Sequence, residues 1–150
     1  MKTSANYFLT PFFIIIGLVV IYFSLVLIIY LIGFISKWHK IAEEYPSKRL
    51  DEPNIHFGSV QFGWVGYNNC VRIGFLDDGL YLALPFPIHF SSQPILIPYQ
   101  KLVHIKSGSE IFGMIKFEEI EVRSKSGVKI QNIKIYSKES SKLSLRMKQF

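Results

Sequence analysis

The sequence predicts one N-terminal transmembrane α-helix followed by a small all-β domain. Phe8–Ile35 is a run of 28 residues without a single charge, and as a helix it would be roughly 42 Å long, more than the hydrocarbon core of about 30 Å requires. From residue 56 onward, β-branched and aromatic residues alternate with Gly, Pro, Asn, Asp and Ser. This second pattern is typical of short strands joined by turns.

The apolar run is interpreted as an uncleaved anchor. A secretory signal has an apolar core of about 7–15 residues and ends at a small-residue cleavage site. Here the run is longer, and it is followed by the bulky and basic residues of Phe34–Lys40. Pro11 lies near the start of the helix, where its missing N–H costs least.

Basic residues flanking the span predict its orientation, because Lys and Arg resist translocation. Lys2 precedes the span, whereas Lys37, Lys40, Lys48 and Arg49 follow it. We therefore expect a single-pass protein of the plasma (inner) membrane, with its N-terminus outside and its C-terminal domain in the cytoplasm. The residues expected at the membrane interface are Tyr7, Lys37, Trp38 and Lys40.

A juxtamembrane helix is expected to continue the span as far as Pro46. Trp38, Ile41, Ala42 and Tyr45 stand at helical spacing and share one face. We expect this face to cover apolar surface of the β domain. The predicted organisation is a tail at 1–7, the span at 8–35, the juxtamembrane amphipathic helix at 36–46, a linker at 47–55 and the β domain at 56–150.

The β domain should contain seven strands and close into a barrel or half-barrel, because closure removes exposed edges. Asp78-Gly79 and Ser126-Gly127 predict two tight hairpins. The predicted strands are His56–Gly63, Cys70–Leu76, Gly79–Leu84, Ile95–Ile105, Met114–Arg123, Val128–Tyr136 and Lys142–Met147.

Residues Gly79–Phe90, followed by Pro94–Ile105, resemble a strand pair of bacterial PH-like and GRAM-like domains. The chain also resembles small bacterial membrane proteins that join one N-terminal span to such a sheet. The resemblance implies an antiparallel PH-like split barrel with the two segments as neighbouring strands. PH-like domains usually cap one end of the barrel with a C-terminal helix, but the alternating pattern of Lys142–Met147 predicts a strand. We therefore expect the barrel without that helix.

The loop after the first strand, Trp64–Asn69, carries no charge. Phosphoinositide-binding PH domains have basic residues there, so the resemblance does not extend to inositide recognition. Trp64 and Tyr67 have two open interpretations: insertion into a bilayer or a partner's pocket, or packing back over the barrel mouth. The candidate interaction surface consists of Trp64, Tyr67, Lys125 and Lys129.

The net charge of +6 arises entirely after residue 100, where eleven Lys and Arg oppose five Glu. Such a face would be attracted to anionic lipid headgroups, or it is an ordinary solvated sheet face guarded by lysines. The single cysteine, Cys70, excludes an intramolecular disulfide and fits a reducing compartment.

No catalytic, metal or cofactor signature is found. In Glu118–Glu121, strand alternation places Glu119 and Glu121 on one face, where they can pair with Lys129 or Lys134. The histidines lack the spacing of a zinc site and are His39, His56, His89 and His104.

The predicted function is that of a non-enzymatic, membrane-anchored β domain for protein or lipid-surface interaction. Its expected partners are the bilayer, with anionic headgroups or a membrane protein as candidates, and not nucleic acid. The alternative is a small accessory subunit that docks into a larger membrane complex through its transmembrane helix.

Overall fold

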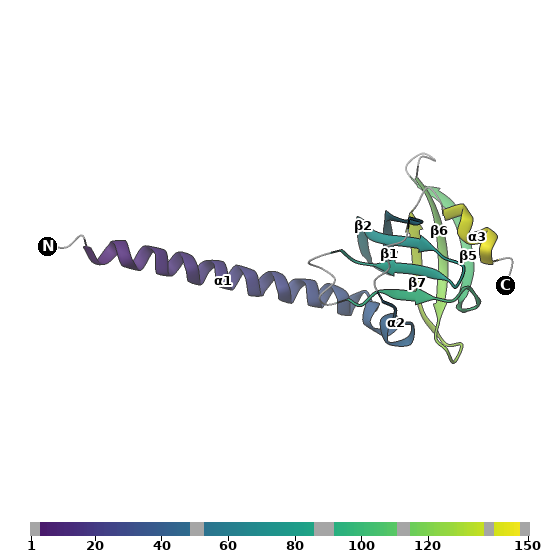
Figure 1. Ribbon diagram of the computed structural model, residues 1–150, viewed down its shortest axis with the longest axis horizontal. Coiled ribbons are helices and arrows are strands. Elements are labelled where there is room, and N and C mark those ends of the chain that lie inside the picture. Colours follow the sequence, from purple (N-terminus) through teal and green to yellow (C-terminus); the bar gives the residue numbers. More distant parts are fainter. Residues whose placement is uncertain (1–3, 49–52, 86–91, 111–114, 137–139, 148–150) are drawn as a thin grey trace.

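The computed structural model describes residues 4–48, 53–85, 92–110, 115–136 and 140–147. A long apolar helix, α1 (Ser4–Ile35), projects from a curled antiparallel sheet (Figure 1). A short helix, α2 (Trp38–Glu44), follows α1, and a third, α3 (Ser140–Met147), follows the sheet. Parts of the predicted tail and linker, together with His89, lie outside the described residues.

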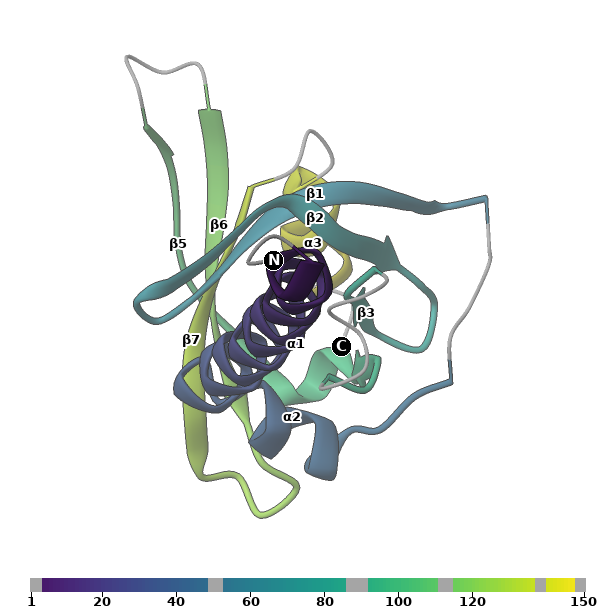
Figure 2. The same cartoon turned by 90° about the vertical axis from the view of Figure 1, so that its left-hand side faces the viewer.

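The sheet has seven strands in the order β4-β3-β2-β1-β7-β6-β5. Because β1 pairs with both β2 and β7, it joins the two ends of the chain's β region into one half-barrel, seen along α1 in Figure 2. The strands are β1 (Ile55–Phe62), β2 (Val65–Phe75), β3 (Leu80–Ala83), β4 (Ile95–Ile97), β5 (Leu102–Glu110), β6 (Ile115–Arg123) and β7 (Lys129–Tyr136).

The predicted continuous strand Ile95–Ile105 is wrong, because the structure divides it into β4 and β5. A 3₁₀ turn, η2 (Tyr99–Lys101), separates the two after Pro98, which has no N–H to give to a ladder. The two strands occupy opposite edges of the sheet, where they pair with β3 and β6 respectively. The chain must therefore turn between them.

The predicted last strand, Lys142–Met147, is also wrong: these residues belong to α3. Leu143 is fully buried and Met147 packs on the same core, while Leu145 between them is exposed. A spacing of four residues matches one face of a helix, whereas a strand would have placed all three on one face. Arg146 of α3 forms an ion pair with Asp77 in the turn between β2 and β3.

Both predicted hairpin turns are confirmed. Leu76 and Gly79 exchange backbone hydrogen bonds at 3.0 and 3.4 Å, closing the β2–β3 turn. In the β6–β7 turn, the Ser124 N–H donates to the Val128 carbonyl at 2.8 Å, and Gly127 has a φ of 86°, which glycine adopts without steric cost.

The predicted continuous helix from the span to Pro46 is wrong. The chain breaks after Ile35, and Lys37 adopts a left-handed conformation with a φ of 55° before α2 begins. The Ser36 hydroxyl donates to the Gly33 carbonyl at 3.0 Å and so occupies one of the last acceptors of α1. This turn allows α2 to run across the sheet instead of continuing along α1.

The expected contact between α2 and the β domain is confirmed, because its apolar face lies within the main core cluster. The four residues predicted to form this face are all buried: Trp38, Ile41, Ala42 and Tyr45. They meet side chains of the curled sheet such as Phe62 and Ile133 in that cluster. The helix therefore forms part of the domain.

We expect ionisation of Tyr99 to destabilise the folded domain at alkaline pH. Burial raises the pKa of Tyr99 to about 12, and its hydroxyl donates to the Leu76 carbonyl at 2.8 Å. Since the folded-state pKa of Tyr99 exceeds the unfolded value of about 10, the stabilisation from the neutral hydroxyl is complete below pH 10. It falls as pH rises from about 10 to 12, by roughly 3 kcal/mol. Urea unfolding of the full chain across this range should show it.

The variant Tyr99→Phe isolates this effect, because it cannot ionise. The difference in unfolding free energy between the native chain and the variant should shrink over the same pH range. A difference that stays constant between pH 10 and 12 would contradict the assignment.

Candidate functional site

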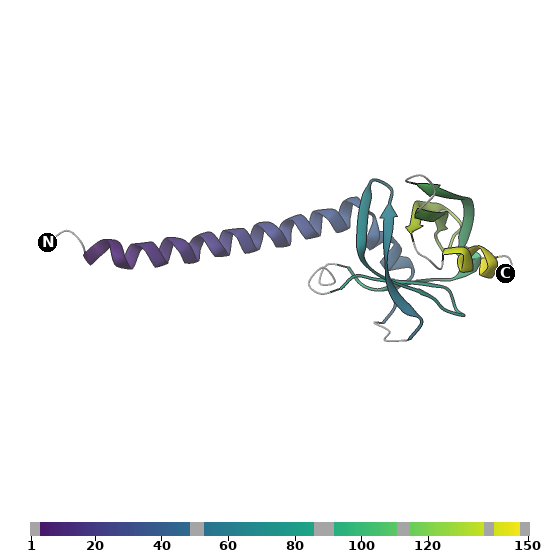
Figure 3. The same ribbon diagram turned by 90° about the horizontal axis from the view of Figure 1, so that it is seen from above.

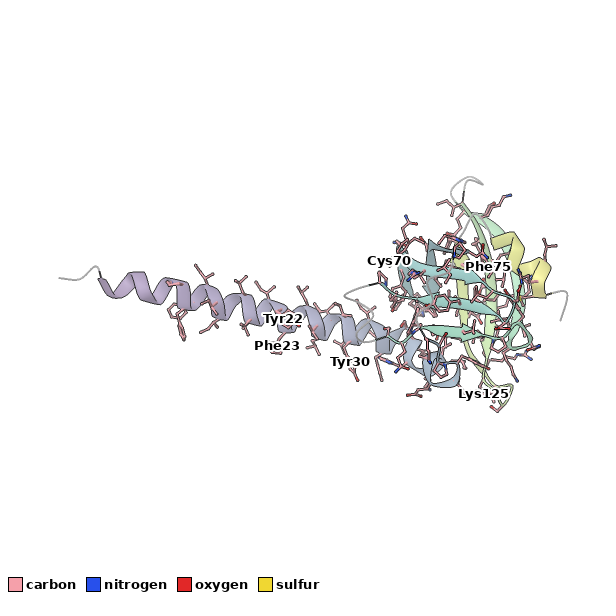
Figure 4. The ribbon with its side chains drawn as sticks, viewed as in Figure 1. Tyr22, Phe23, Tyr30, Cys70, Phe75 and Lys125 are labelled. Carbon is pink, nitrogen blue, oxygen red and sulfur yellow. The ribbon has the colours of Figure 1, made fainter. Side chains whose placement is uncertain are left out.

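The most prominent candidate feature is α1 itself. Within Pro11–Ile35, the most apolar 18-residue window has a mean hydropathy of 3.2 and no residue buried by the rest of the chain. Its aromatic residues Tyr22, Phe23 and Tyr30 are exposed and project from the helix (Figure 4). Among the described residues, this is the one helix long and apolar enough to cross a membrane. These properties are consistent with a membrane anchor or a signal sequence.

The exit of α1 is fixed to the β1–β2 hairpin by a cluster of aromatic side chains. The Trp38 ring lies 5.0 Å from the Phe62 ring and 6.0 Å from the Tyr67 ring, centroid to centroid. The Tyr67 hydroxyl donates to Ser36 Oγ at 3.1 Å, and Trp38 Nε1 donates to the Gln93 carbonyl at 2.8 Å. We refer to Ser36, Trp38, Phe62 and Tyr67 as the junction cluster.

The structure changes the interpretation of two predicted site residues. Trp38 is completely buried, so its ring belongs to the core and does not face lipid headgroups as expected. Tyr67 lies in β2 and is also buried, so its ring packs back on the domain, the second of its two open interpretations. Burial raises the pKa of its hydroxyl. Lys37 and Lys40 are exposed and remain predicted interface residues; the side chain of Tyr7 lies outside those described.

Trp64 is the fully exposed member of the predicted pair. Its side chain is 100% exposed, the highest value among the large hydrophobic residues described. It follows Gly63, whose φ of 58° favours glycine in the turn. The Gly63 N–H donates to the Asn132 carbonyl at 3.3 Å, and Gln61 Nε2 donates to the Gly63 carbonyl at 2.8 Å. The turn is therefore well supported although its aromatic side chain has no covering.

The far end of α2 is attached to the β6–β7 turn. The Tyr45 hydroxyl donates to the Arg123 carbonyl at 2.7 Å, and the Lys125 N–H donates to Glu44 Oε2 at 3.1 Å. Beside these contacts lies a shallow groove of about 530 Å³, lined by Lys40, Glu43, Glu44, Lys125 and Ile130. Lys125, a predicted interaction residue, thus lies on the domain (Figure 4) well away from the exposed aromatics of α1.

The basic face of β5–β7 is largely paired with glutamates. Glu121 lies 2.8 Å from Arg123 Nε and 3.3 Å from Lys129 Nζ, and the hydrogen bond from Arg123 lowers the pKa of Glu121. The predicted pairing of Glu121 with Lys129 is therefore confirmed. Two further ion pairs join Lys106 to Glu119 at 3.5 Å and Lys134 to Glu110 at 3.4 Å.

This pairing has a consequence for lipid attraction. A lysine that already faces a carboxylate contributes less to the field that an anionic surface would feel. The arrangement favours the solvated-face interpretation of the C-terminal charge excess, and it makes Lys129 a weaker candidate for headgroup contact than its sequence position indicates.

A polar cluster on β5 and β6 escapes prediction from sequence. His104 Nε2 lies 2.8 Å from Glu118 Oε2 and 3.0 Å from Ser107 Oγ, and the Ser107 hydroxyl donates to the same carboxylate oxygen at 2.6 Å. An irregularity between His104 and Lys106 places residues 104 and 107 on one face, whereas regular alternation would separate them. No signal in the sequence marks this bulge.

The geometry of this cluster differs from that of a hydrolytic triad. In a triad, the carboxylate accepts from Nδ1–H and orients the imidazole, while the serine hydroxyl donates to Nε2, which takes its proton. Here both partners meet the same nitrogen, and the serine is already bonded to the carboxylate. The cluster satisfies the buried Glu118 carboxylate and does not prepare the Ser107 hydroxyl for attack.

A second groove, of about 240 Å³, lies between the β1–β2 hairpin and the ends of β5–β7; its lining includes Gln61, Asn68, Glu110 and Tyr136. The Tyr136 hydroxyl lies 3.2 Å from Gln61 Oε1 and 3.4 Å from both carboxylate oxygens of Glu110. Three polar side chains of this groove are therefore bonded to one another. Among the residues that the structure describes, no three His, Cys, Asp or Glu side chains are grouped so as to hold a metal ion.

Comparisons with known proteins give this chain no relative. No protein-family model matches it, and neither a curated protein nor a solved structure does. The assignment of a function therefore depends on the arrangement of its own residues.

Proposed function

We propose that this chain is a single-pass membrane protein that holds a small PH-like β domain at the cytoplasmic surface, for interaction with lipid or protein and without catalysis. The observation that carries the proposal is the junction cluster, which joins the exposed apolar helix to the domain's core. The Ser36 hydroxyl of this cluster also donates to the Gly33 carbonyl of α1 at 3.0 Å, so the end of the helix itself is bonded into the junction, a contact that a cleaved signal does not need. An anchor that sets the position of a domain over a membrane does.

Two features support the PH-like assignment. The strands formed from the residues that carry the resemblance, β3 and β4, are antiparallel neighbours, pairing Leu80 with Ile97. The C-terminal helix that such domains usually have is present as α3, with Leu143 in the core. The sheet is a curled half-barrel with β4 and β5 as its edges.

The anchor is tested by isolating membranes and measuring the intact mass of the protein extracted from them. We expect a chain that retains Phe8–Ile35 and resists extraction by alkaline carbonate. A soluble product that begins after residue 35 would overturn the proposal. Reporter fusions after residue 150 test orientation, since a periplasmic signal would reverse the proposed topology.

The accessory-subunit alternative remains a second proposal, since the most apolar window of α1 has no buried residue and its surface can face lipid or another protein's helices equally. Pull-down of the full chain after mild detergent extraction separates the two. A stoichiometric membrane partner that is retained by α1 when the β domain is removed favours the subunit.

A further inference from the structure

We propose that Trp64, at the tip of the β1–β2 hairpin, is a second membrane contact that inserts its indole into the headgroup region beside the exit of α1. This inference rests on the proposed function in taking α1 as a membrane anchor. It goes further by naming the residue that fixes the domain's orientation against the bilayer.

The first support is position. Both flanks of Trp64 contact the residues that directly follow α1: Phe62 packs on Trp38 at the start of α2, and the Tyr67 hydroxyl donates to Ser36, the residue after α1. Two residues of extended chain span at most about 7 Å, so Trp64 cannot lie far from this exit. Figure 3 shows the β1–β2 hairpin standing beside the end of α1.

The second support is chemistry. The segment from Gly63 to Asn69 carries no charge, so moving its tip into a headgroup layer requires no ion to lose water. Indole, with an apolar body and one N–H donor, prefers this layer. The main chain of the turn is already bonded to Asn132 and Gln61 through Gly63. Insertion of the ring therefore does not require the backbone of the turn to become ordered.

The third support is the length of the span. Twenty-five residues from Pro11 to Ile35 make a helix of roughly 37 Å against a core of about 30 Å. A helix longer than the core accommodates by tilting, and its interfacial anchors set the direction of tilt. Tilt toward the hairpin would bring Trp64 to the surface of the leaflet.

The chain provides its own probe, since Trp38 and Trp64 are its two tryptophans. The full-length Trp38→Phe variant, reconstituted in phosphatidylcholine liposomes, reports on Trp64 alone. We expect Trp64 to emit at shorter wavelength than a water-exposed tryptophan and to be less accessible to acrylamide. Lipids brominated near the headgroup should quench it more strongly than lipids brominated near the chain end. Because the tip is uncharged, added phosphatidylglycerol should leave the quenching unchanged.

The inference is overturned if Trp64 in the liposomes emits at long wavelength and is quenched by acrylamide but not by brominated lipids. That result would hold against it even if a protein partner were afterwards found to cover Trp64. Flotation of the liposomes separates this from failure of the proposed function, in which the chain would not float with lipid at all. If the Trp38→Phe variant does not fold, the emission of Trp64 is obtained by subtracting the emission of the Trp64→Phe variant from that of the native chain. In that comparison, the remaining Trp38 should show no lipid quenching.

Discussion

Replacing Trp38 by alanine is expected to destabilise the β domain by about 3–5 kcal/mol, the usual cost of removing a large buried aromatic side chain. Trp38 has no exposed surface, packs on Phe62 and Tyr67, and supplies the donor for the Gln93 carbonyl. Its loss would leave a cavity where α2 meets the sheet and an unpaired acceptor beside it. The domain and its anchor would then no longer be held as one unit.

Pulse proteolysis of the full chain in urea, in mild detergent, measures this change as a lower unfolding midpoint. The matched control is Trp64→Ala, which removes the same side chain from a fully exposed site and should change stability by no more than about 0.5 kcal/mol. Equal midpoints for the two variants would contradict the burial of Trp38.

The second large effect is expected at Gly79, which ends the β2–β3 turn. A methyl group on this residue would lie 2.2 Å from the Ile97 carbonyl oxygen, an atom of the neighbouring backbone, and the φ of 155° disfavours a side chain. Because the obstacle is main chain in a paired strand, no side-chain rotation relieves it. We expect Gly79→Ala to cost about 3 kcal/mol, the upper part of the usual range for overpacking.

The control for this variant is Gly66→Ala, near the start of β2. There the added methyl group would meet only Asn68 Oδ1 at 3.9 Å, and the change should be neutral or slightly stabilising, because alanine restricts the unfolded chain. Urea unfolding that gives Gly79→Ala a native midpoint would show that β3 and β4 are not held as close as described.

Local patterns were sufficient where the structure depends on local chemistry. Phe8–Ile35 forms a helix because an uncharged apolar run of that length has few alternatives, and Ser-Gly at 126–127 forms a turn because glycine accepts a positive φ. The helical spacing of Trp38, Ile41, Ala42 and Tyr45 correctly indicated a face that the domain covers.

The same reasoning failed where distant partners decide. The alternating pattern of Lys142–Met147 favours a strand, and only the packing of Leu143 on the core selects α3. Ile95–Ile105 looks continuous in sequence, but its halves pair at opposite edges of a curled sheet. The bulge that gathers His104, Ser107 and Glu118 depends on the register between β5 and β6.

Composition, hydrophobic period and backbone preference are sufficient to predict the apolar N-terminal helix, the amphipathic segment after it and a β domain with two hairpin turns. Three features depend on contacts between distant parts of the chain: the break at Lys37, the burial of Tyr67 and the full exposure of Trp64. An aromatic side chain is buried or exposed according to which surface lies beside it, and that surface is formed by residues far along the chain.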